Sequence, residues 1–260
     1  MVRGGTILGS ARAPEFATPQ GREQALRQLR NEHIEGLVVI GGNGSQAGSL
    51  SLHQAGFPAV GVASTIDNDL SLVDTCIGVD TALNTALQLV DRLRDTASSH
   101  HRAFVVELMG RKSGYLALMA GIASGAEVIC TPEAPVSPEE VVRIGRSALD
   151  AGKTHFLVLV AEGSPTKAMD IVDNLNADGC YETRLSVLGH VQRGGGPLAF
   201  DRLLASRSAA AALGALAGGQ SGVVAGLASG EITLMNTEEA ILPTQKVTPQ
   251  LLELGSVLSR

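Results

Sequence analysis

The chain has 260 residues, of which 44% are hydrophobic and 18% charged, a composition typical of folded globular proteins. Its formal net charge of −6 argues against broad nucleic-acid binding, because neutralising phosphates requires a basic surface. No apolar run is long enough to span a bilayer, and Met1 to Gly5 lack the apolar region of a signal peptide, so we expect a cytoplasmic protein without membrane or nucleic-acid partners.

The cysteine and glycine residues further restrict the class of protein that the sequence can encode. Cys76, Cys130 and Cys180 lack the spacing of metal ligands, and we expect small core residues rather than disulfide partners. The 31 glycines, beside only 3% aromatic residues, indicate many tight turns and close backbone approaches. Such turns are typical of α/β proteins that bind phosphate groups.

The first quarter of the chain predicts alternating helices and strands. Residues 3–12 carry glycines and small residues without periodicity, which indicates a loop. Within it, Arg12 is either a phosphate ligand or a solvated charge. Apolar spacing then predicts a helix over 19–33, a strand over 37–40, a helix over 46–53 and a strand over 57–63.

A glycine-rich turn follows the strand at 37–40. Gly41 to Ser45 leads into a helix whose first amides point into the turn, and these amides suit a phosphate group together with the helix dipole. Gly42 to Ala47 also fits the dinucleotide pattern G-x-G-x-x-A, which leaves an NAD-dependent oxidoreductase open as an alternative. The sequence contains no Walker A loop.

Polar residues crowd the end of the strand at 57–63. The stretch Ser64-Thr65-Ile66-Asp67-Asn68-Asp69 supplies two carboxylates and two hydroxyls in six positions. Ligands bind at the carboxyl ends of strands in open α/β sheets, so we expect the chemistry here. From these residues alone, an Asx-turn that caps the next helix is the alternative.

The rest of the chain repeats the alternation of strand and helix. This rhythm predicts an α/β fold with doubly wound, largely parallel sheets, and the length of the chain favours two Rossmann-like domains. Residues 95–102 are expected as a polar loop, and residues 163–179 as an irregular surface segment. The other expected elements are helices over 78–94, 115–123, 136–149, 203–216 and 248–258, and strands over 103–108, 127–132, 155–160, 185–188 and 223–227.

Together these stretches resemble the phosphofructokinase family over essentially the whole chain. The shared motifs, in family order, are Gly4-Gly5-Thr6, Ser10-Ala11-Arg12, Gly41-Gly42-Asn43-Gly44-Ser45, Thr65-Ile66-Asp67-Asn68-Asp69, Met109-Gly110-Arg111, Gly189-His190-Val191-Gln192-Arg193-Gly194-Gly195 and residues 203–207. Several long motifs in one order are more specific than any single glycine loop. The likeness to bacterial members implies a glycolytic kinase that transfers the γ-phosphate of ATP to the 1-hydroxyl of fructose 6-phosphate, with Mg²⁺.

The resemblance implies two domains, each built from separate segments of the chain. A larger nucleotide-binding domain would comprise residues 1–78 and 193–245. A smaller sugar-phosphate-binding domain would comprise residues 79–192 and 246–260. The expected assembly is a homotetramer with shared active sites.

The resemblance also implies roles for individual residues. Asp67 would be the base that takes the proton of the sugar 1-hydroxyl, and Arg12 would steady the transferring phosphoryl group. The implied residues are Arg12, Ala13, Gly42, Asn43, Gly44 and Ser45 for ATP; Asn43 and Asp69 for the metal; Thr65, Asp69 and Arg111 for catalysis beside Asp67; Thr65, Ile66, Asp67, Met109, Gly110, Arg111, Glu162, His190, Val191, Gln192 and Arg193 for the sugar phosphate; and Arg102 and Arg184 for the 6-phosphate, from a neighbouring subunit.

Further positions bear on the phosphate donor and on regulation. Related enzymes that use pyrophosphate carry Asp in place of Gly44 and Lys in place of Ser64. The small Gly44 therefore favours ATP, whereas Ser64 fits neither pattern. Arg94, Glu127 and Lys153 match positions that bind a nucleotide effector in bacterial relatives, which implies an allosteric enzyme.

Two departures from the family pattern give the main alternative. Asn43 replaces an aspartate that helps to hold Mg²⁺, and the lost charge should weaken binding of a hard cation. The family also begins with a strand and a glycine-rich loop over the nucleotide, and this sequence begins after that βα unit. The alternative is an N-terminally truncated or inactive paralogue that binds sugar phosphate or nucleotide without efficient turnover.

Overall fold

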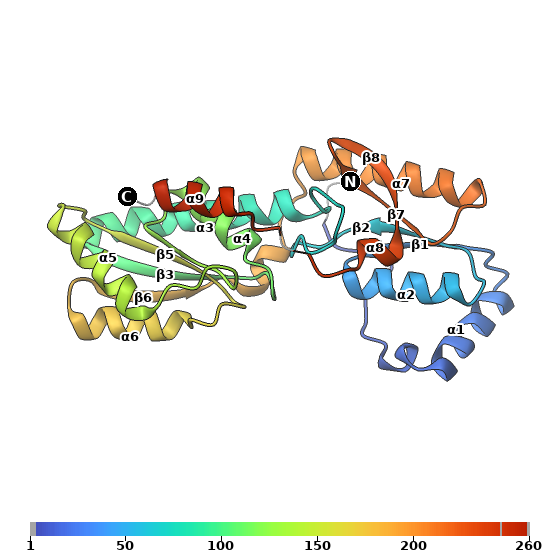
Figure 1. Cartoon of the computed structure of the whole chain (residues 1–260), viewed down its shortest axis with the longest axis horizontal. Helices are drawn as coiled ribbons and strands as arrows, with labels where there is room; N and C mark the ends of the chain where they lie inside the picture. The colour runs from blue at the N-terminus through green and yellow to red at the C-terminus, as the bar shows by residue number, and fades with distance from the viewer. Residues whose placement is uncertain (1–3, 245, 259–260) are drawn as a thin grey trace. The chain divides into compact units, whose positions relative to one another are not determined.

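The computed structural model describes residues 4–244 and 246–258, and the chain divides into two compact units, each with its own sheet (Figure 1). Arg3, the first residue of the predicted N-terminal loop, lies outside the described residues. Unit 1 comprises Met1–Thr65, Asp69–Val79 and Gly196–Thr244; unit 2 comprises Ile66–Asn68, Asp80–Gly195 and Gln245–Arg260. The predicted α/β class with largely parallel sheets is confirmed.

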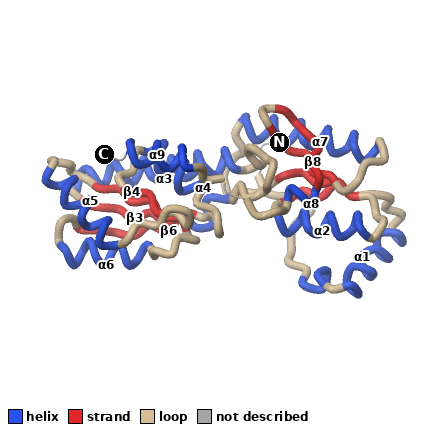
Figure 2. The backbone as a smooth tube through the Cα atoms, viewed as in Figure 1, coloured by secondary structure: helices blue, strands red, loops and turns tan. Residues whose placement is uncertain are grey.

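Helices and strands alternate along most of the backbone (Figure 2). The helices are η1 Pro14–Ala17, α1 Pro19–Asn31, α2 Asn43–Gln54, α3 Val79–His100, α4 Tyr115–Ser124, α5 Pro138–Asp150, α6 Ala168–Asp178, η2 Gly189–Arg193, α7 Ala199–Ala217, α8 Thr237–Ala240 and α9 Pro249–Leu258. The strands are β1 Leu37–Gly41, β2 Ala59–Ala63, β3 Arg102–Leu108, β4 Val128–Cys130, β5 Phe156–Ala161, β6 Glu182–Val187, β7 Val223–Ala228 and β8 Glu231–Asn236.

The sheet of unit 1 has the strand order β1-β2-β7-β8, with β1, β2 and β7 parallel and β8 antiparallel to β7. Helix α7 covers one face and α2 the other (Figure 1). Every residue of β2 is buried, as expected for a central strand covered on both faces. The buried Gln46 of α2 donates from Nε2 to the main-chain oxygens of Gly41 and Val62, at 2.9 and 3.1 Å, and so ties α2 to β1 and β2.

The sheet of unit 2 has the order β4-β5-β3-β6, and all of its strands are parallel. Alternate residues of β3 point to opposite faces of the sheet. Val105 packs in the core cluster that contains residues of α5 and α6, whereas Val106 packs in the cluster that contains residues of α3 and α4. Helices cover both faces of the sheet (Figure 1). The carboxyl ends of the parallel strands therefore deliver their loops to one edge.

Two predicted loops are wrong in part. Residues 95–100 continue α3, because Ala97 is fully buried against the core. The segment 163–179 contains α6, whose Ile171, Val172 and Leu175 are buried at helical spacing. A third difference is β8, a strand that the sequence pattern did not predict.

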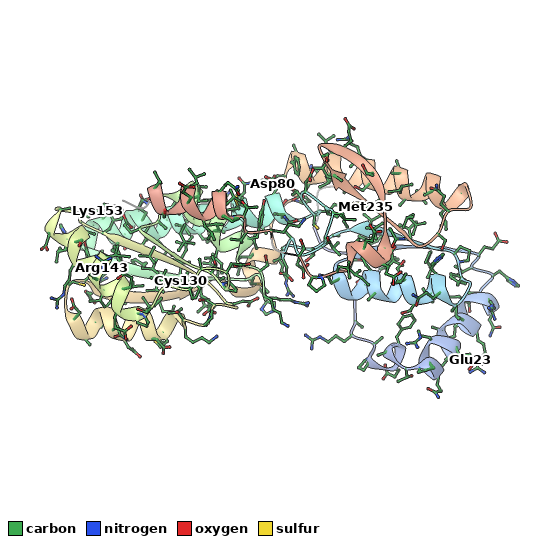
Figure 3. The ribbon with its side chains drawn as sticks, viewed as in Figure 1. Glu23, Asp80, Cys130, Arg143, Lys153 and Met235 are labelled. Atoms are coloured by element: carbon green, nitrogen blue, oxygen red, sulfur yellow. The ribbon has the colours of Figure 1, made fainter. Side chains whose placement is uncertain are left out.

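None of the cysteines among the described residues forms a disulfide. Cys76 and Cys130 are buried, as expected for core residues, and burial raises the pKa of the Cys130 thiol to about 11 (Figure 3). Cys180 is only half-buried. None of the helices that the structure describes is long and apolar enough to span a membrane.

Candidate active site

The glycine-rich turn of unit 1 joins β1 to α2. Gly42 is the N-cap residue of the helix and has no side chain that could cap the first amides of α2. A Cβ on Gly42 would lie 2.9 Å from the Cβ of Thr65, whereas one on Gly44 would meet nothing within 4 Å. The turn thus borders open space and has Thr65 packed beside it, which is the local geometry that a phosphate group needs.

Asn43 connects this turn to the other end of the polar stretch. Its Nδ2 donates a hydrogen bond to the main-chain oxygen of Asp69, at 3.1 Å. Its Oδ1 is buried and accepts no hydrogen bond from the described part of the chain. An orphaned buried oxygen suits a cation or a cation-bound water, so Asn43 and the adjacent Asp69 fit Mg²⁺.

The described residues contain no larger cluster of potential metal ligands. Across residues 4–244 and 246–258, no three His, Cys, Asp or Glu side chains form a group that could hold a metal ion. Mg²⁺ is commonly bound by one or two protein ligands together with substrate phosphates and water. The small ligand set of Asn43 and Asp69 matches that mode of binding.

Asp67 and Arg111 form an ion pair in unit 2. Asp67 is 7% exposed, and its Oδ2 lies 3.4 Å from Nε of the exposed Arg111. Asn68 is fully buried with a φ of 49°, a left-handed conformation that asparagine adopts more readily than most residues. The backbone therefore turns sharply next to the Asp67 carboxylate and is fixed there by burial of Asn68.

The loop that carries Arg111 is bound by two other loops. Arg111 has a φ of 53°, which is also left-handed. Oε1 of Glu162, after β5, accepts hydrogen bonds from the main-chain N–H groups of Gly110 and Arg111, at 3.1 and 2.7 Å. Oε1 of Gln192, in η2, accepts one from the N–H of Met109 at 2.7 Å. The structure therefore brings together the predicted residues of all three loops.

The basic residues predicted for the sugar phosphate lie in separate parts of unit 2. His190 and Arg193 are exposed in η2, beyond the carboxyl end of β6. Arg102 is the first residue of β3 and Arg184 the third of β6. A strand of seven residues, such as β3, is about 20 Å long. Arg102 is therefore remote from Arg111 of the same chain.

Glu182 forms ion pairs with both Arg102 and Arg184. Its Oε2 lies 2.8 Å from Nε of Arg102, and its Oε1 pairs with Arg184. The hydrogen bond from Arg102 holds the pKa of Glu182 below its ordinary value. Arg102 and Arg184 thus form one cationic group around a single carboxylate.

The predicted effector residues are divided between two environments. Glu127 is 7% exposed, and its carboxylate accepts from Nζ of Lys153 at 3.2 Å and from the N–H of Leu157 at 2.8 Å. Lys153 comes shortly after the end of α5 and is labelled in Figure 3. Arg94, on α3, has a buried Nε that finds no partner among the described residues. The effector role of the three residues stays a prediction.

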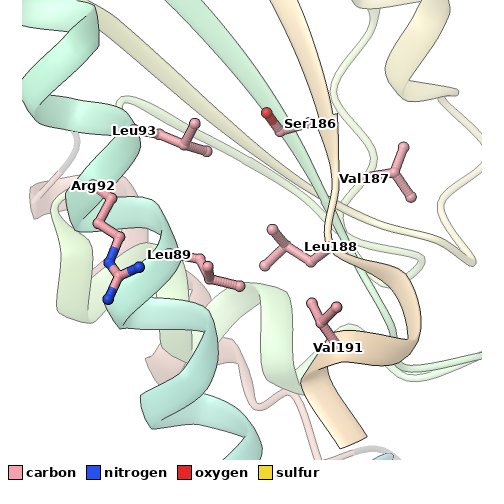
Figure 4. A pocket seen from close by; sticks show the side chains of 7 residues that line it. All are labelled: Leu89, Arg92, Leu93, Ser186, Val187, Leu188 and Val191. Atoms are coloured by element: carbon pink, nitrogen blue, oxygen red, sulfur yellow. The ribbon is translucent and has the colours of Figure 1, made fainter. Parts of the chain in front are cut away.

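An open groove of about 360 Å³ lies beside η2 in unit 2. Leu89 and Leu93 of α3 face Leu188 and Val191 across it (Figure 4). This lining is mostly apolar, so the groove does not suit a phosphate group. Val191, predicted to bind the sugar, is 58% exposed here.

The remaining predicted residues lie in the segments expected for them. Arg12 and Ala13 are in an exposed segment of unit 1 just before η1. Ser45 is exposed in the first turn of α2, and Ile66 is half-buried beside Asp67. Their roles stay predictions.

Glu133 supports the loop that follows Arg111, a contact that the sequence pattern did not predict. Its Oε1 accepts a hydrogen bond from the N–H of Gly114 at 3.1 Å, just before α4 begins. A Cβ on Gly114 would lie 2.4 Å from Glu133 Oε2, so the glycine permits this approach. The available signal was an acidic residue directly after the predicted strand at 127–132.

The fold and the site define a class of protein. Parallel α/β units whose strand ends carry an open glycine turn and a buried carboxylate beside an arginine belong to the α/β proteins that handle phosphate groups. The family model described as Phosphofructokinase matches residues 1–216. The chain belongs to the phosphofructokinase family.

Individual relatives extend over almost the whole chain. It is 49% identical over 259 residues to ATP-dependent 6-phosphofructokinase 1 of Thermus thermophilus, covering 99% of this chain and 80% of that protein. It is 46% identical to ATP-dependent 6-phosphofructokinase of Thermotoga neapolitana, covering 99% and 81%. The solved phosphofructokinase of Saccharomyces cerevisiae superposes with a TM-score of 0.85 at 34% identity, and the match covers 99% of this chain and 39% of the yeast chain.

Proposed function

We propose that this chain is an ATP-dependent 6-phosphofructokinase, which transfers the γ-phosphate of ATP to the 1-hydroxyl of fructose 6-phosphate. The observation that carries the proposal is Asp67, a buried carboxylate paired with Arg111 at the carboxyl edge of a parallel sheet. Its sequence neighbours Thr65 and Asp69 contact the open turn of Gly42 and Asn43. One short segment thus carries both an acid–base group and contacts to a phosphate-binding turn.

Asp67 is the base of the proposed reaction. Its carboxylate takes the proton of the sugar 1-hydroxyl, the sugar oxygen bonds to the γ-phosphorus, and the bond from that phosphorus to the leaving oxygen of ADP breaks. Arg111 holds the carboxylate in place through the ion pair. Arg12 would offset the charge that spreads over the oxygens of the transferring group.

Asn43 and Asp69 are the proposed holders of Mg²⁺. The orphaned Oδ1 of Asn43 and the hydrogen bond that its Nδ2 donates to the main-chain oxygen of Asp69 support this assignment. When bound, Mg²⁺ supplies charge neutralisation at the phosphate oxygens of the nucleotide. Because Asn43 has no charge, we expect a higher Mg²⁺ requirement than an aspartate would give.

The proposed donor is ATP rather than pyrophosphate. The open space around Gly44 supports this choice, since a nucleotide needs more room than pyrophosphate. The relatives from Thermus and Thermotoga are both named as ATP-dependent enzymes. Unit 1 would accordingly be the nucleotide-binding unit, and unit 2 the sugar-phosphate-binding unit.

The proposed assembly is a cytoplasmic homotetramer in which subunits share sites. Arg102 begins β3, at the end of the sheet remote from Arg111, and shares its partner Glu182 with Arg184, which supports their acting together in the site of a neighbouring copy. Val187 and Val191, each 58% exposed at the apolar groove, support a subunit contact on this side of unit 2. Arg94, Glu127 and Lys153 remain the proposed effector site.

A coupled assay of fructose 1,6-bisphosphate formation tests the function. The 260-residue chain is supplied with Mg²⁺ and either ATP or pyrophosphate. Turnover with ATP alone is the expected result, and turnover with pyrophosphate alone would contradict the choice of donor. No turnover with either donor, while fructose 6-phosphate still raises the Tm, would favour the alternative of a chain that binds without catalysis.

A further inference from the structure

Gln46 is a polar side chain that is completely buried in unit 1. It lies near the start of α2 and is 0% exposed. Its Nε2 donates to the main-chain oxygen of Gly41 at 2.9 Å and to that of Val62 at 3.1 Å, and the oxygen of Val39 lies 3.2 Å from the same nitrogen. An amide group has two protons to donate, so this side chain commits both of them to β1 and β2.

The oxygens around Nε2 fix the orientation of the Gln46 amide group. Rotating the group would set Oε1 against the oxygens of Gly41 and Val62, acceptor against acceptor. In the observed orientation, Oε1 accepts no hydrogen bond from the described residues. A Cβ on Gly61 would lie 2.0 Å from this Oε1, so the glycine in the middle of β2 gives the amide its space.

Two unfavourable features accompany the hydrogen bonds of Gln46. A buried oxygen without a partner costs stability, and a glycine inside a strand weakens that strand. An apolar side chain of similar length would fill the same space without an unpaired oxygen. The hydrogen bonds of Gln46 therefore serve to fix the local geometry more than to raise stability.

The main-chain oxygens that Gln46 binds lie where two functional segments leave the sheet. Gly41 directly precedes Gly42 of the glycine-rich turn. Val62 lies near the end of β2, just before the polar stretch that begins at Ser64. The main-chain N–H of Ser64 donates to the same oxygen of Gly41, at 3.1 Å. Gln46 thus joins the start of the turn to the start of the polar stretch.

We infer that Gln46 is a positioning residue, which sets the distance between the glycine-rich turn and Thr65 and thereby places the phosphates of ATP. The inference rests on the proposed function, because it takes this turn to be the nucleotide site. Gln46 is enclosed by protein and so acts through the backbone of Gly41 and Gly42 rather than by touching the nucleotide. A displaced turn binds the nucleotide less tightly and misaligns the transferring phosphate, whereas the residues proposed for the sugar phosphate in unit 2 keep their places.

Side-chain amide exchange measured by NMR on the full wild-type chain tests the hydrogen bonds without any variant or activity. The Nε2 protons of Gln46 should exchange at least about a hundredfold more slowly than those of Gln20, an exposed residue of α1. Exchange as fast as that of Gln20 would overturn the inference, because the amide would then be open to water.

Steady-state kinetics of Gln46→Met test the positioning role. Methionine keeps a similar length but removes both donors and the unpaired oxygen, so the Tm should stay within about 4 °C of wild type. The KM for ATP should rise by about tenfold and kcat should fall by about tenfold, while the KM for fructose 6-phosphate changes by less than about twofold. Ser49→Ala is the matched control. Ser49 of the same helix is 1% exposed and its Oγ has no partner in the described part of the chain, so all three constants should match wild type.

Unchanged kcat and KM for ATP in Gln46→Met would overturn the inference. Equal rises of both KM values, or a similar loss in Ser49→Ala, would also overturn it, because either result reports a general disturbance of the fold. If Gln46→Met does not fold, Gly61→Ala displaces the amide from the side of β2 and should give the same kinetic pattern.

Binding of ADP separates this inference from the proposed function. A wild-type chain without turnover would refute the proposed function, and the rise in Tm that ADP causes would then judge Gln46 alone. That rise should be smaller in Gln46→Met than in wild type and unchanged in Ser49→Ala. An equal rise in Gln46→Met and wild type would overturn the inference.

Discussion

The turn after β1 in unit 1 and the turn after β3 in unit 2 use their main-chain amides in opposite ways. Both turns leave the carboxyl end of a parallel strand and lead toward a helix. In the first, the N-cap residue Gly42 has no side chain to cap the amides of α2, and Gly44 borders open space. In the second, side chains of Glu162 and Gln192 occupy three amides in succession.

We call the turn after β1 the receiving turn, because its amides can bind a ligand. We call the turn after β3 the supporting turn, because its amides bind protein side chains. Free amides at a helix start attract an anion, so the first turn suits a phosphate group. Amides that already bind protein oxygens fix the backbone, so the second turn presents a side chain, that of Arg111. Both turns are rich in small residues, so their composition does not distinguish them. The presence or absence of side-chain acceptors beside the amides decides which role a turn has.

The largest expected effect comes from removing the base that the supporting turn orients. Asp67→Asn keeps the size of the side chain but cannot take the proton, so kcat should fall by about 10²–10⁴. Binding of fructose 6-phosphate, measured as a rise in Tm, should persist. Glu23→Gln, at an exposed carboxylate of α1, is the control and should behave as wild type. A fully active Asp67→Asn enzyme would remove Asp67 as the base.

The next largest effect is expected when one methyl group is added beside each turn, by Gly163→Ala at the supporting turn and by Gly44→Ala at the receiving turn. In Gly163→Ala the new Cβ collides with the main-chain oxygen of Arg111, so the free energy of unfolding should fall by about 1–3 kcal/mol, and kcat should fall with it. In Gly44→Ala the methyl group meets nothing within 4 Å, so stability should hold or rise by up to about 1 kcal/mol. The KM for ATP should nevertheless rise in Gly44→Ala. Urea unfolding and steady-state kinetics measure both, and equal stability losses would contradict the distinction.

A smaller effect is expected where the receiving turn meets the polar stretch. Asn43→Asp removes the Nδ2 donor and sets a carboxylate against the main-chain oxygen of Asp69. Without metal, the free energy of unfolding should fall by about 1–2 kcal/mol, because the bond is lost and two acceptors face each other. Added Mg²⁺ should restore more stability in the variant than in wild type. Unfolding curves with chelator and with Mg²⁺ test this, and equal responses to Mg²⁺ would argue against a metal at Asn43.

The smallest effect concerns the far end of the unit 2 sheet. Arg102 lowers the pKa of Glu182, so the ion pair contributes stability above the ordinary pKa of 4.5, and that contribution disappears as the pH falls through the lowered value. Glu182→Gln should therefore be slightly less stable than wild type near neutral pH, with the difference shrinking at about pH 3. Urea unfolding at the two pH values measures it. A difference that grows on acidification would have the wrong sign.

Several features of the fold could be predicted from the sequence because their signals are local. Buried parallel strands are short apolar runs, which is why β1, β2, β3 and β5 were predicted close to their observed bounds. Helix α6 was not predicted, because the polar residues at the start of the segment obscure the helical spacing of Ile171, Val172 and Leu175. Polar residues at an exposed helix face carry little information about structure.

The sequence by itself determined the family and the α/β class and predicted the segments of the candidate site, because long motifs and apolar periodicity are written along the chain. The ion pair of Asp67 with Arg111, the bonds that Glu162 and Gln192 make to the Met109–Arg111 amides, and the support of Gly114 by Glu133 were decided only by the tertiary structure. The physical reason is that a hydrogen bond depends on distance and direction in space. Parallel strands bring such partners to one edge from residues that are 19 to 83 positions apart in the chain.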